Sequence, residues 1–326
     1  MLRPLTLALL LLAACNTSDP GKATPAASAS QAAEVAPPAP APAPAPAPKP
    51  TAKLGNQWKG VGFKGPESVL YDEKSDLYLV SNVDGKPYEA DGKAFISKLA
   101  PMGQGVELKW IEGGKKGVTL HAPKGMAITG DTLWVADLDT VRTFNLTTGA
   151  PTGEVKIPGA TFLNDLASTK DGKVLVSDTG LKPTKDGGLG ASGTDAVYAI
   201  DKDRKVTTIA KDKSLGGPNG LASFGDGRVY VVTMGSGELY SLDPKGTKGD
   251  VQRMPKGTLD GIALGREHYF VSSWDANAIY RGRPGSAFEL FIENVKSPAD
   301  ISFDRSRNRL LVPLMNEDEV RAYELP

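Results

Sequence analysis

A five-residue pattern recurs six times along the chain, and its second position changes from copy to copy. In one-letter code the copies read PESVL (66–70), PKGMA (123–127), LNDLA (163–167), PNGLA (218–222), LDGIA (259–263) and PADIS (298–302). The later positions hold small or turn-forming residues followed by apolar ones, as is typical where a β-strand begins. A pattern of constant shape with one variable, mostly polar position predicts a ring of side chains that face one point.

The spacing of these pentads indicates which kind of repeat they belong to. Most begin about 40 residues after the preceding one, which is the period of a propeller blade. A second apolar run follows each pentad after turn residues, as at 170–172 and 225–227, and a third and usually a fourth run follow. We therefore predict an all-β fold, a six-bladed β-propeller with four-stranded blades. An irregular β-sandwich would explain the strands but not the six pentads.

The sixth repeat contains only three predicted strands, at 298–303, 308–313 and 318–323. An alternating stretch at 56–63 precedes the first pentad and has no blade of its own. An open sheet edge invites unwanted pairing, and closing the ring removes it. We expect residues 56–63 to supply the outer strand of the sixth blade.

The N-terminus has the pattern of an export signal. Arg3 precedes an apolar run at 5–12, and Ala13-Ala14-Cys15 follows. Residues 12–15 resemble the bacterial lipobox, in which the cysteine is lipidated. Cys15 is the only cysteine in the chain, so an ordinary secretory signal with an incidental cysteine is the weaker interpretation. By resemblance to bacterial sorting rules, Asn16 after the cysteine implies the outer membrane, with the protein on its periplasmic or surface face.

Three segments are predicted along the chain. Residues 1–14 form the signal peptide, 15–54 form the lipidated cysteine and a tether, and 55–326 form the propeller. The tether ends in an Ala-Pro alternation up to Pro50, which precludes helix and sheet pairing and favours an extended spacer. The 38 basic and 38 acidic residues cancel, so the composition argues against a nucleic-acid partner and limits membrane contact to the lipid.

The ring predicts a site at one end of the propeller. The start of a blade's first strand and the end of its second strand lie at the same end of the molecule. Five side chains from strand-two ends therefore join the ring at its rim, where they suit a polar small-molecule ligand with one stacking face: Asn82, Asp137, Asp178, Trp274 and Asp275. Long loops follow two of these strands, and the Gly-rich one at 179–194 reads as a lid or as a tolerated insertion.

The second positions of the pentads supply oxygen ligands. Glu67, Asn164, Asn219 and Asp260 offer two carboxylates and two amide carbonyls, a set that suits calcium completed by water. Alternatively, these groups hydrogen-bond to water along the channel. Lys124 also enters the ring, where its ammonium can pair with Glu67 or Asp260 in place of a metal, or contact substrate.

From these residues the chain resembles the family of senescence marker protein, gluconolactonase and luciferin-regenerating enzyme, over about residues 60 to 326. The Asn-Gly step at 219–220 and the Asp-Gly step at 260–261 carry the resemblance. It implies a six-bladed, calcium-dependent propeller with Glu67, Asn219 and Asp260 as metal ligands and Asn164 as their neighbour. It further implies that the metal polarises an ester carbonyl and that Asp260 helps to activate water.

Three positions depart from the family pattern. Pro66 precedes the Glu, Leu70 takes the place of a Trp, and Phe162 stands where the lactonases carry a substrate-binding Arg. Two functions therefore stay open. One is a calcium-dependent lactonase or esterase-like hydrolase of small molecules. The other is a non-catalytic, membrane-anchored propeller with a salt-bridged ring that binds a ligand or a protein.

Overall fold

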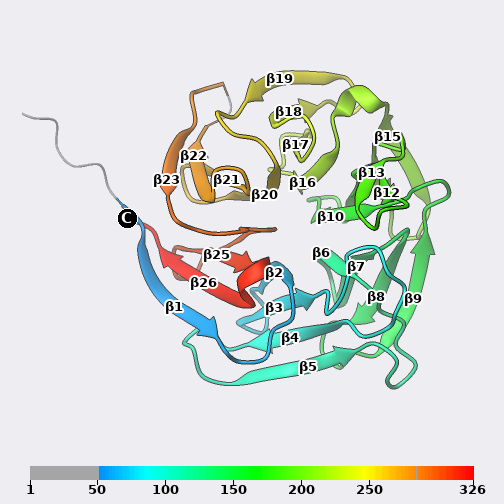
Figure 1. Cartoon of the computed structure of the whole chain (residues 1–326), viewed down its shortest axis with the longest axis vertical. Helices are drawn as coiled ribbons and strands as arrows, with labels where there is room; N and C mark the ends of the chain where they lie inside the picture. The colour runs from blue at the N-terminus through cyan, green and yellow to red at the C-terminus, as the bar shows by residue number, and fades with distance from the viewer. Residues whose placement is uncertain (1–50, 284) are drawn as a thin grey trace, which may run out of the picture. The chain divides into compact units, whose positions relative to one another are not determined.

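The computed structural model describes residues 51–283 and 285–326. Within them, six four-stranded antiparallel sheets surround a central axis, one for each pentad, which confirms the predicted propeller (Figure 1). The signal peptide, the lipidation of Cys15 and all but the end of the tether fall on residues 1–50, outside the described residues. No helix in the described ranges is long and apolar enough to cross a membrane.

The first three blades each begin with a pentad. Blade one contains β2 (Pro66–Asp72), β3 (Leu77–Asn82), β4 (Phe95–Leu99) and β5 (Val106–Glu112); blade two contains β6 (Pro123–Thr129), β7 (Thr132–Asp137), β8 (Thr140–Asn145) and β9 (Pro151–Lys156). Blade three contains β10 (Leu163–Ser168), β11 (Val174–Asp178), β14 (Ala196–Ile200) and β15 (Val206–Lys211), and its extra hairpin is β12 (Leu181–Pro183) and β13 (Leu189–Ala191).

The other three blades complete the ring. Blade four contains β16 (Pro218–Ala222), β17 (Val229–Thr233), β18 (Glu238–Leu242) and β19 (Lys248–Arg253); blade five contains β20 (Leu259–Leu264), β21 (Tyr269–Ser273), β22 (Ala278–Gly282) and β23 (Glu289–Ile292). Blade six contains β24 (Ser302–Asp304), β25 (Arg309–Leu314), β26 (Glu319–Glu324) and β1 (Lys53–Lys59), and two 3₁₀ turns are η1 (Lys213–Leu215) and η2 (Met315–Glu317).

An N-terminal strand closes blade six, as expected, but its bounds differ from 56–63. β1 begins at Lys53, inside the predicted tether, and pairs antiparallel with β26 from Lys53 opposite Glu324 to Lys59 opposite Glu319. It ends at Lys59 because Gly60 and Gly62 adopt positive φ angles of 69° and 107°, which turn the backbone out of the sheet.

The innermost strand of blade six is shorter than the predicted 298–303. Regular pairing with β25 covers only Ser302–Asp304. Before it, Pro298 forms an isolated bridge with Leu314 of β25, and the backbone of Asp300 also pairs with blade one. Asp300 N donates to Glu67 O at 2.9 Å, and Val69 N donates to Asp300 O at 3.4 Å. The last and first blades are thus joined at the channel as well as at the outer strand.

The fourth pentad residue anchors each blade to its neighbour. In all six repeats this side chain is at most 5 % exposed, and each copy belongs to a different apolar cluster: Val69, Met126, Leu166, Leu221, Ile262 and Ile301. Burying one such side chain contributes about 1.5–3 kcal/mol. The pentads therefore hold the blades together as well as lining the channel.

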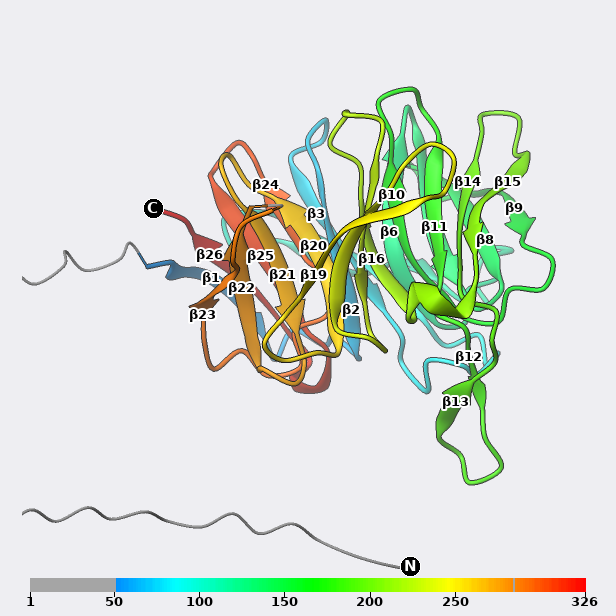
Figure 2. The same cartoon turned by 90° about the horizontal axis from the view of Figure 1, so that it is seen from above.

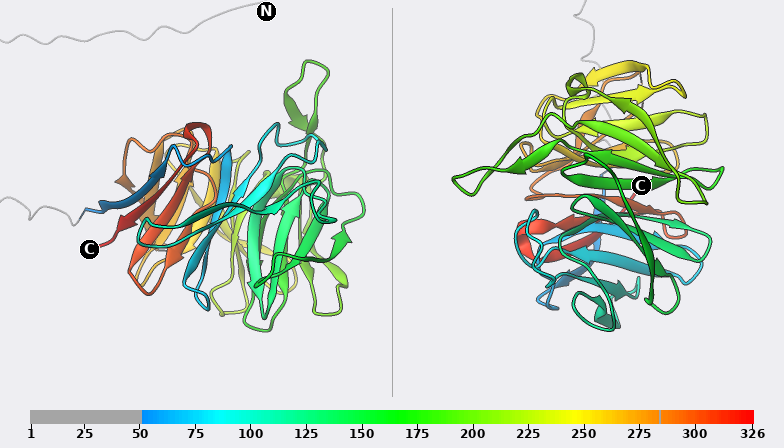
Figure 3. Two further views of the ribbon diagram at one scale, coloured as in Figure 1. Left: turned by 90° about the horizontal axis from the view of Figure 1, so that it is seen from below. Right: turned by 90° about the vertical axis from the view of Figure 1, so that its right-hand side faces the viewer.

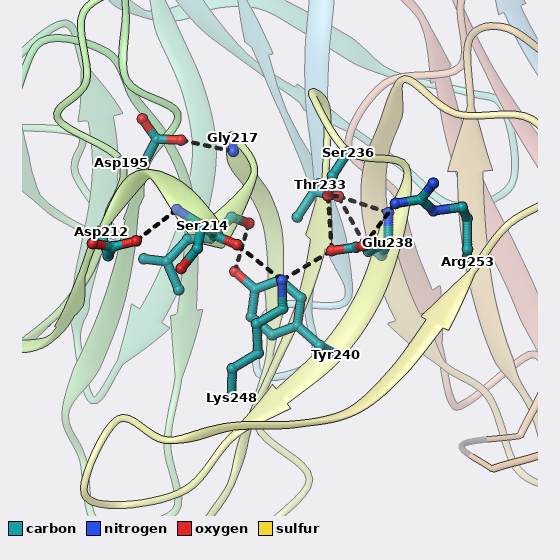
Figure 4. A network of polar contacts seen from close by, with 11 residues as sticks. Asp195, Asp212, Ser214, Gly217, Thr233, Ser236, Glu238, Tyr240, Lys248 and Arg253 are labelled. Carbon is teal, nitrogen blue, oxygen red and sulfur yellow. Dashed lines mark hydrogen bonds and ion pairs between the residues drawn. The ribbon is translucent and has the colours of Figure 1, made fainter. Parts of the chain in front are cut away.

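A polar network braces the outer half of blade four (Figure 4). Glu238 accepts hydrogen bonds from Lys248 Nζ at 2.9 Å and Arg253 Nη2 at 3.0 Å. Lys248 also donates to Ser214 O at 3.0 Å and lies over the Tyr240 ring, 4.2 Å from its centroid. The network ties two strands of the blade to η1.

Candidate functional site

The same irregularity occurs at the start of five innermost strands. In β6, Pro123 lies opposite Asp137, yet Met126 lies opposite Val135, so the pentad contains one residue more than its partner strand. Blades one, three, four and five have the same bulge at the same place. A bulge re-aims the side chains around it. It explains how the second and third pentad positions both reach the channel.

The structure brings the predicted ring together. The pKa of the Glu67 carboxyl is shifted by four nearby charges, which come from blades two, three, five and six: Lys124, Asp165, Asp260 and Asp300. The polar second-position side chains are 1–6 % exposed: Glu67, Lys124, Asn164, Asn219 and Asp260. The sixth member of the ring is Ala299.

A second layer of acids, which was not predicted from the sequence, lies beside the ring. Asp165 accepts hydrogen bonds from the backbone N–H groups of Leu166 and Leu221, both at 2.6 Å. Asp300 Oδ2 accepts from Ser68 Oγ at 2.5 Å. Both acids occupy the third pentad position, where three other copies have glycine. The aspartates at the third position of the third and sixth pentads were the sequence feature from which this layer could have been predicted.

Glycine at the third position is a consequence of close blade packing. A Cβ atom at Gly125 would lie 2.6 Å from Asp165 Cα, and one at Gly261 would lie 2.4 Å from Ile301 N. Neither distance is tolerable, because the obstacle is the backbone of the next blade. Close approach fixes the innermost strands relative to one another, and with them the ring.

Burial and mutual repulsion dominate the electrostatics of the channel. Burial, followed by the charges of Asp260 and Asp300, raises the pKa of Glu67 well above its usual value. Burial and the Asp300 charge raise the pKa of Asp260 to about 8, although the hydrogen bond from Trp274 opposes the shift. Burial raises the pKa of Asp300 to about 7.

One cation faces these acids, and it does not pair with them directly. Lys124 Nζ donates to Ala122 O at 3.2 Å and lies 4.3 Å from the centroid of the Phe162 ring. Among the described residues it forms no ion pair within 4.0 Å, so the direct contact with Glu67 or Asp260 expected for a salt-bridged ring is not made. Burial lowers the pKa of Lys124, and Glu67 partly offsets this effect.

The ring contains acceptors without donors. Glu67 Oε2 and Asp260 Oδ1 are buried and have no hydrogen-bond partner within the described part of the chain. The amide nitrogen of Asn164 donates to Thr179 Oγ1 at 2.9 Å, and that of Asn219 donates to Leu259 O at 3.3 Å, which leaves their carbonyl oxygens as the atoms for a cation. These donors fit a hard cation such as calcium.

No three His, Cys, Asp or Glu side chains within the two described ranges converge tightly enough to hold a metal ion. The predicted set contains two carboxylates and two amides, so this absence does not bear on it. Calcium binding stays a prediction.

Three of the predicted rim residues brace loops. Asn82, Asp137 and Asp178 are fully buried at the ends of second strands. Their side chains accept hydrogen bonds from backbone N–H groups just before a pentad, at 3.1 Å from Lys64, 2.8 Å from Ala122 and 3.0 Å from Phe162 respectively. A substrate-binding role for these three residues stays a prediction.

Trp274 is the rim residue that contacts the ring. Its Nε1 donates to Asp260 Oδ2 at 2.8 Å, so the half-buried indole orients the carboxyl group. Asp275 beside it is exposed.

The two long loops meet at that end of the propeller. The loop at 179–194 forms the β12–β13 hairpin, which stands out from the blades (Figures 2 and 3). Tyr88, in the long loop that follows Asn82, donates its hydroxyl to Gly187 O in the hairpin at 2.5 Å. At the hairpin's base, Thr179 Oγ1 accepts from Asn164 and donates to Pro218 O at 2.7 Å. The hairpin is thereby connected to the ring.

A cavity of about 500 Å³ occupies the opposite end of the channel. All six innermost strands line it, and its inner end reaches the third-position acids, Asp165 and Asp300. The second-position ring residues do not line it. The channel is therefore open at the end away from the predicted rim.

Comparison with known proteins supports the fold. No protein-family model and no curated protein sequence matches the chain. A gluconolactonase from Xanthomonas campestris has a similar structure, with 18 % identity, a TM-score of 0.63 and coverage of 85 % of this chain and 95 % of that one. A luciferin-regenerating enzyme has 14 % identity, a TM-score of 0.63 and the same coverage. Virginiamycin B lyase from Staphylococcus aureus has 15 % identity, a TM-score of 0.59 and coverage of 84 % and 100 %. The structural neighbours thus include a gluconolactonase and a luciferin-regenerating enzyme, which the sequence resembles, and what all three neighbours share with this chain is the fold.

Proposed function

We propose that the protein is a calcium-dependent hydrolase of small lactones or esters, with Glu67, Asn164, Asn219 and Asp260 holding the cation. One observation carries the proposal: two buried carboxylate oxygens, Glu67 Oε2 and Asp260 Oδ1, have no partner although they lie in the same ring. Leaving a buried acceptor unpaired is costly, and leaving a buried charge unpaired costs more. A bound cation removes both costs.

The residues divide the chemistry as follows. The cation, when bound, polarises the ester carbonyl. Asp260 takes a proton from the attacking water and returns it to the departing alkoxide, while Trp274 Nε1 keeps the carboxyl group oriented. Without a cation the pKa of Asp260 is about 8, so the group keeps its proton at neutral pH and is a poor base. A nearby positive charge lowers that pKa and frees the carboxylate.

We also propose that the protein is exported and lipid-anchored in a bacterial cell envelope. The sequence pattern at residues 12–15 supports this proposal, with Cys15 as the lipidated residue. Cys15→Ser is expected to release the protein from membranes or to leave the signal uncleaved. Detergent fractionation measures this, and a processed Cys15→Ser protein that still fractionates with membranes contradicts it.

A second candidate is a non-catalytic ligand- or protein-binding propeller. The burial of the ring favours it, since no polar ring residue is more than 6 % exposed. The projecting β12–β13 hairpin offers such a protein a surface for a partner.

Calcium titration followed by a lactone and ester panel distinguishes the two. Calcium at a hundredfold excess over its dissociation constant is expected to stabilise the protein by about 2.7 kcal/mol. Asp260→Ala should abolish both that gain and hydrolysis, whereas Glu293→Gln, a change of an exposed acid that is not a member of the ring, should change neither. An unchanged melting curve with calcium and with chelator contradicts the metal site. Calcium binding without hydrolysis above the Asp260→Ala background supports the binding module.

A further inference from the structure

We propose that Lys124 is a catalytic residue of the ring, whose ammonium binds the oxygen that gains negative charge as an ester or lactone is hydrolysed. The inference rests on the proposed function and adds a residue to it. Lys124 is not one of the proposed metal ligands. It comes from blade two, whereas the ligands come from blades one, three, four and five.

The first support is the unused hydrogen-bonding capacity of Lys124. An ammonium group has three N–H donors. The side chain is 1 % exposed, and in the described chain Nζ has one hydrogen-bond acceptor, Ala122 O. The Phe162 ring face stabilises the charge without accepting a conventional hydrogen bond. Two donors therefore stay available at a buried position, which is the condition for a strong contact with an anionic oxygen.

The second support is that the N–H donors of Lys124 do not contact the unpaired acceptors, Glu67 Oε2 and Asp260 Oδ1. Lysine has a long, flexible stem, and Glu67 is the largest charge that acts on Lys124. A lysine that served only to neutralise Glu67 would be expected to contact it, yet no ion pair within 4.0 Å forms in the described part of the chain. The ring thus keeps a basic part separate from an acidic part, and a ligand with an acceptor oxygen is complementary to the basic one.

The third support is that the backbone around Lys124 is fixed. Ala122 N donates to Asp137 Oδ1 at 2.8 Å, and Asp137 in turn pairs with Arg142 Nε at 3.1 Å. On the other side, Gly125 packs against the backbone of Asp165 too closely for a Cβ atom. A donor held on such a support changes little during a reaction, and preorganisation of this kind is what makes a charge effective in catalysis.

The proposed step balances as follows. Water attacks the carbonyl carbon and its proton passes to the carboxylate of Asp260, while the carbonyl π electrons move to the oxygen that Lys124 binds. The tetrahedral intermediate then collapses, the carbon–oxygen bond to the alkoxide breaks, and the alkoxide takes the proton from Asp260. A lactone and one water give one hydroxy acid, and Lys124 keeps its three protons throughout.

The test compares Lys124→Met, which removes the charge at similar length, with Lys124→Arg, which retains it. Calcium-dependent stabilisation, hydrolysis and the affinity for an alkyl phosphonate ester, a stable mimic of the tetrahedral intermediate, are measured on the whole protein. Lys124→Met is expected to lower kcat about 10²–10³-fold, the effect of removing one donor to an oxyanion, and to weaken phosphonate binding by a similar factor. Calcium-dependent stabilisation should persist, and Lys124→Arg should recover part of both losses.

The outcomes separate this inference from the proposed function. Wild-type hydrolysis and phosphonate affinity in a folded Lys124→Met protein overturn the role of Lys124 and leave the hydrolase intact. An equal loss of hydrolysis and phosphonate affinity in Lys124→Met and Lys124→Arg also overturns the role of Lys124, since the positive charge would then not be the cause of the activity. If the wild-type protein neither hydrolyses the panel nor binds the phosphonate, the proposed function fails and the inference fails with it.

Discussion

Asp260→Asn is expected to flatten the dependence of stability on pH. In the folded protein the pKa of Asp260 is about 8, whereas an unfolded aspartate has a pKa of about 3.9. Between these values the folded state keeps a proton that the unfolded state has lost. Stability from this group is therefore complete below the unfolded pKa and is lost as pH rises toward 8.

The expected effect is large enough to measure. One proton bound only by the folded state changes the free energy of unfolding by roughly 1 kcal/mol per pH unit. From pH 5 to 8 the loss amounts to a few kcal/mol. Asp300, with a pKa of about 7, adds a loss of the same sign, and so does Glu67. His268 has a lowered pKa and contributes in the opposite direction, so the comparison between variant and wild type is the informative quantity.

The assay is urea unfolding at pH 5, 6, 7 and 8 in the presence of a chelator. Asparagine keeps an oxygen that accepts from Trp274 Nε1, so the variant loses the titration and not the hydrogen bond. Glu293→Gln, an exposed change, should keep the wild-type slope. Calcium should reduce the wild-type slope, because a cation replaces the proton. Parallel pH profiles for wild type and Asp260→Asn would refute the reasoning.

Three further predictions concern the fold. Trp58→Ala should lower the free energy of unfolding by about 3–5 kcal/mol in denaturant titrations, since Trp58 is 2 % exposed in the closing strand; a loss under 1 kcal/mol contradicts this. Gly125→Ala should destabilise by at least 1–3 kcal/mol, because its Cβ would lie 2.1 Å from Asp165 Oδ1, and unchanged thermal melting argues against the close contact. Glu238→Gln should destabilise the protein at neutral pH but much less at acidic pH. Burial alone would raise the pKa of Glu238, but hydrogen bonds from Lys248 and Arg253 outweigh burial and lower it, so the stabilisation by Glu238 is lost as pH falls. An equal loss of stability at both pH values contradicts this prediction.

The sequence was informative where structure is set locally. Strand entries, turns and the repeat period depend on neighbouring residues, so the six pentads predicted the blades and the ring around Glu67 and Asp260. The closing strand was predictable because an open edge is unfavourable whatever its sequence. Its bounds were not, since they depend on where Gly60 and Gly62 turn the backbone.

The remaining features depend on contacts between segments distant in sequence. The bulges become visible only in the register between paired strands, and they determine that the third position also reaches the channel, hence the missed Asp165 and Asp300. The bracing role of Asp137 and Asp178 depends on which backbone N–H groups lie beside them. From sequence alone, a polar residue at a strand end is equally compatible with a ligand contact and with a brace.

The closing strand has a consequence for synthesis of the protein. β1 is among the first segments of the propeller to leave the ribosome, and its partner β26 is the last. Gln57 and Glu319, which hydrogen-bond across this pair, are 262 residues apart in sequence. Bringing such distant segments together costs on the order of 5 kcal/mol of chain entropy, and the contacts that offset it form only at the end. Until β26 leaves the ribosome, a nascent chain exposes the edge that β26 will cover, so we expect chaperone dependence to be greatest just before β26 emerges.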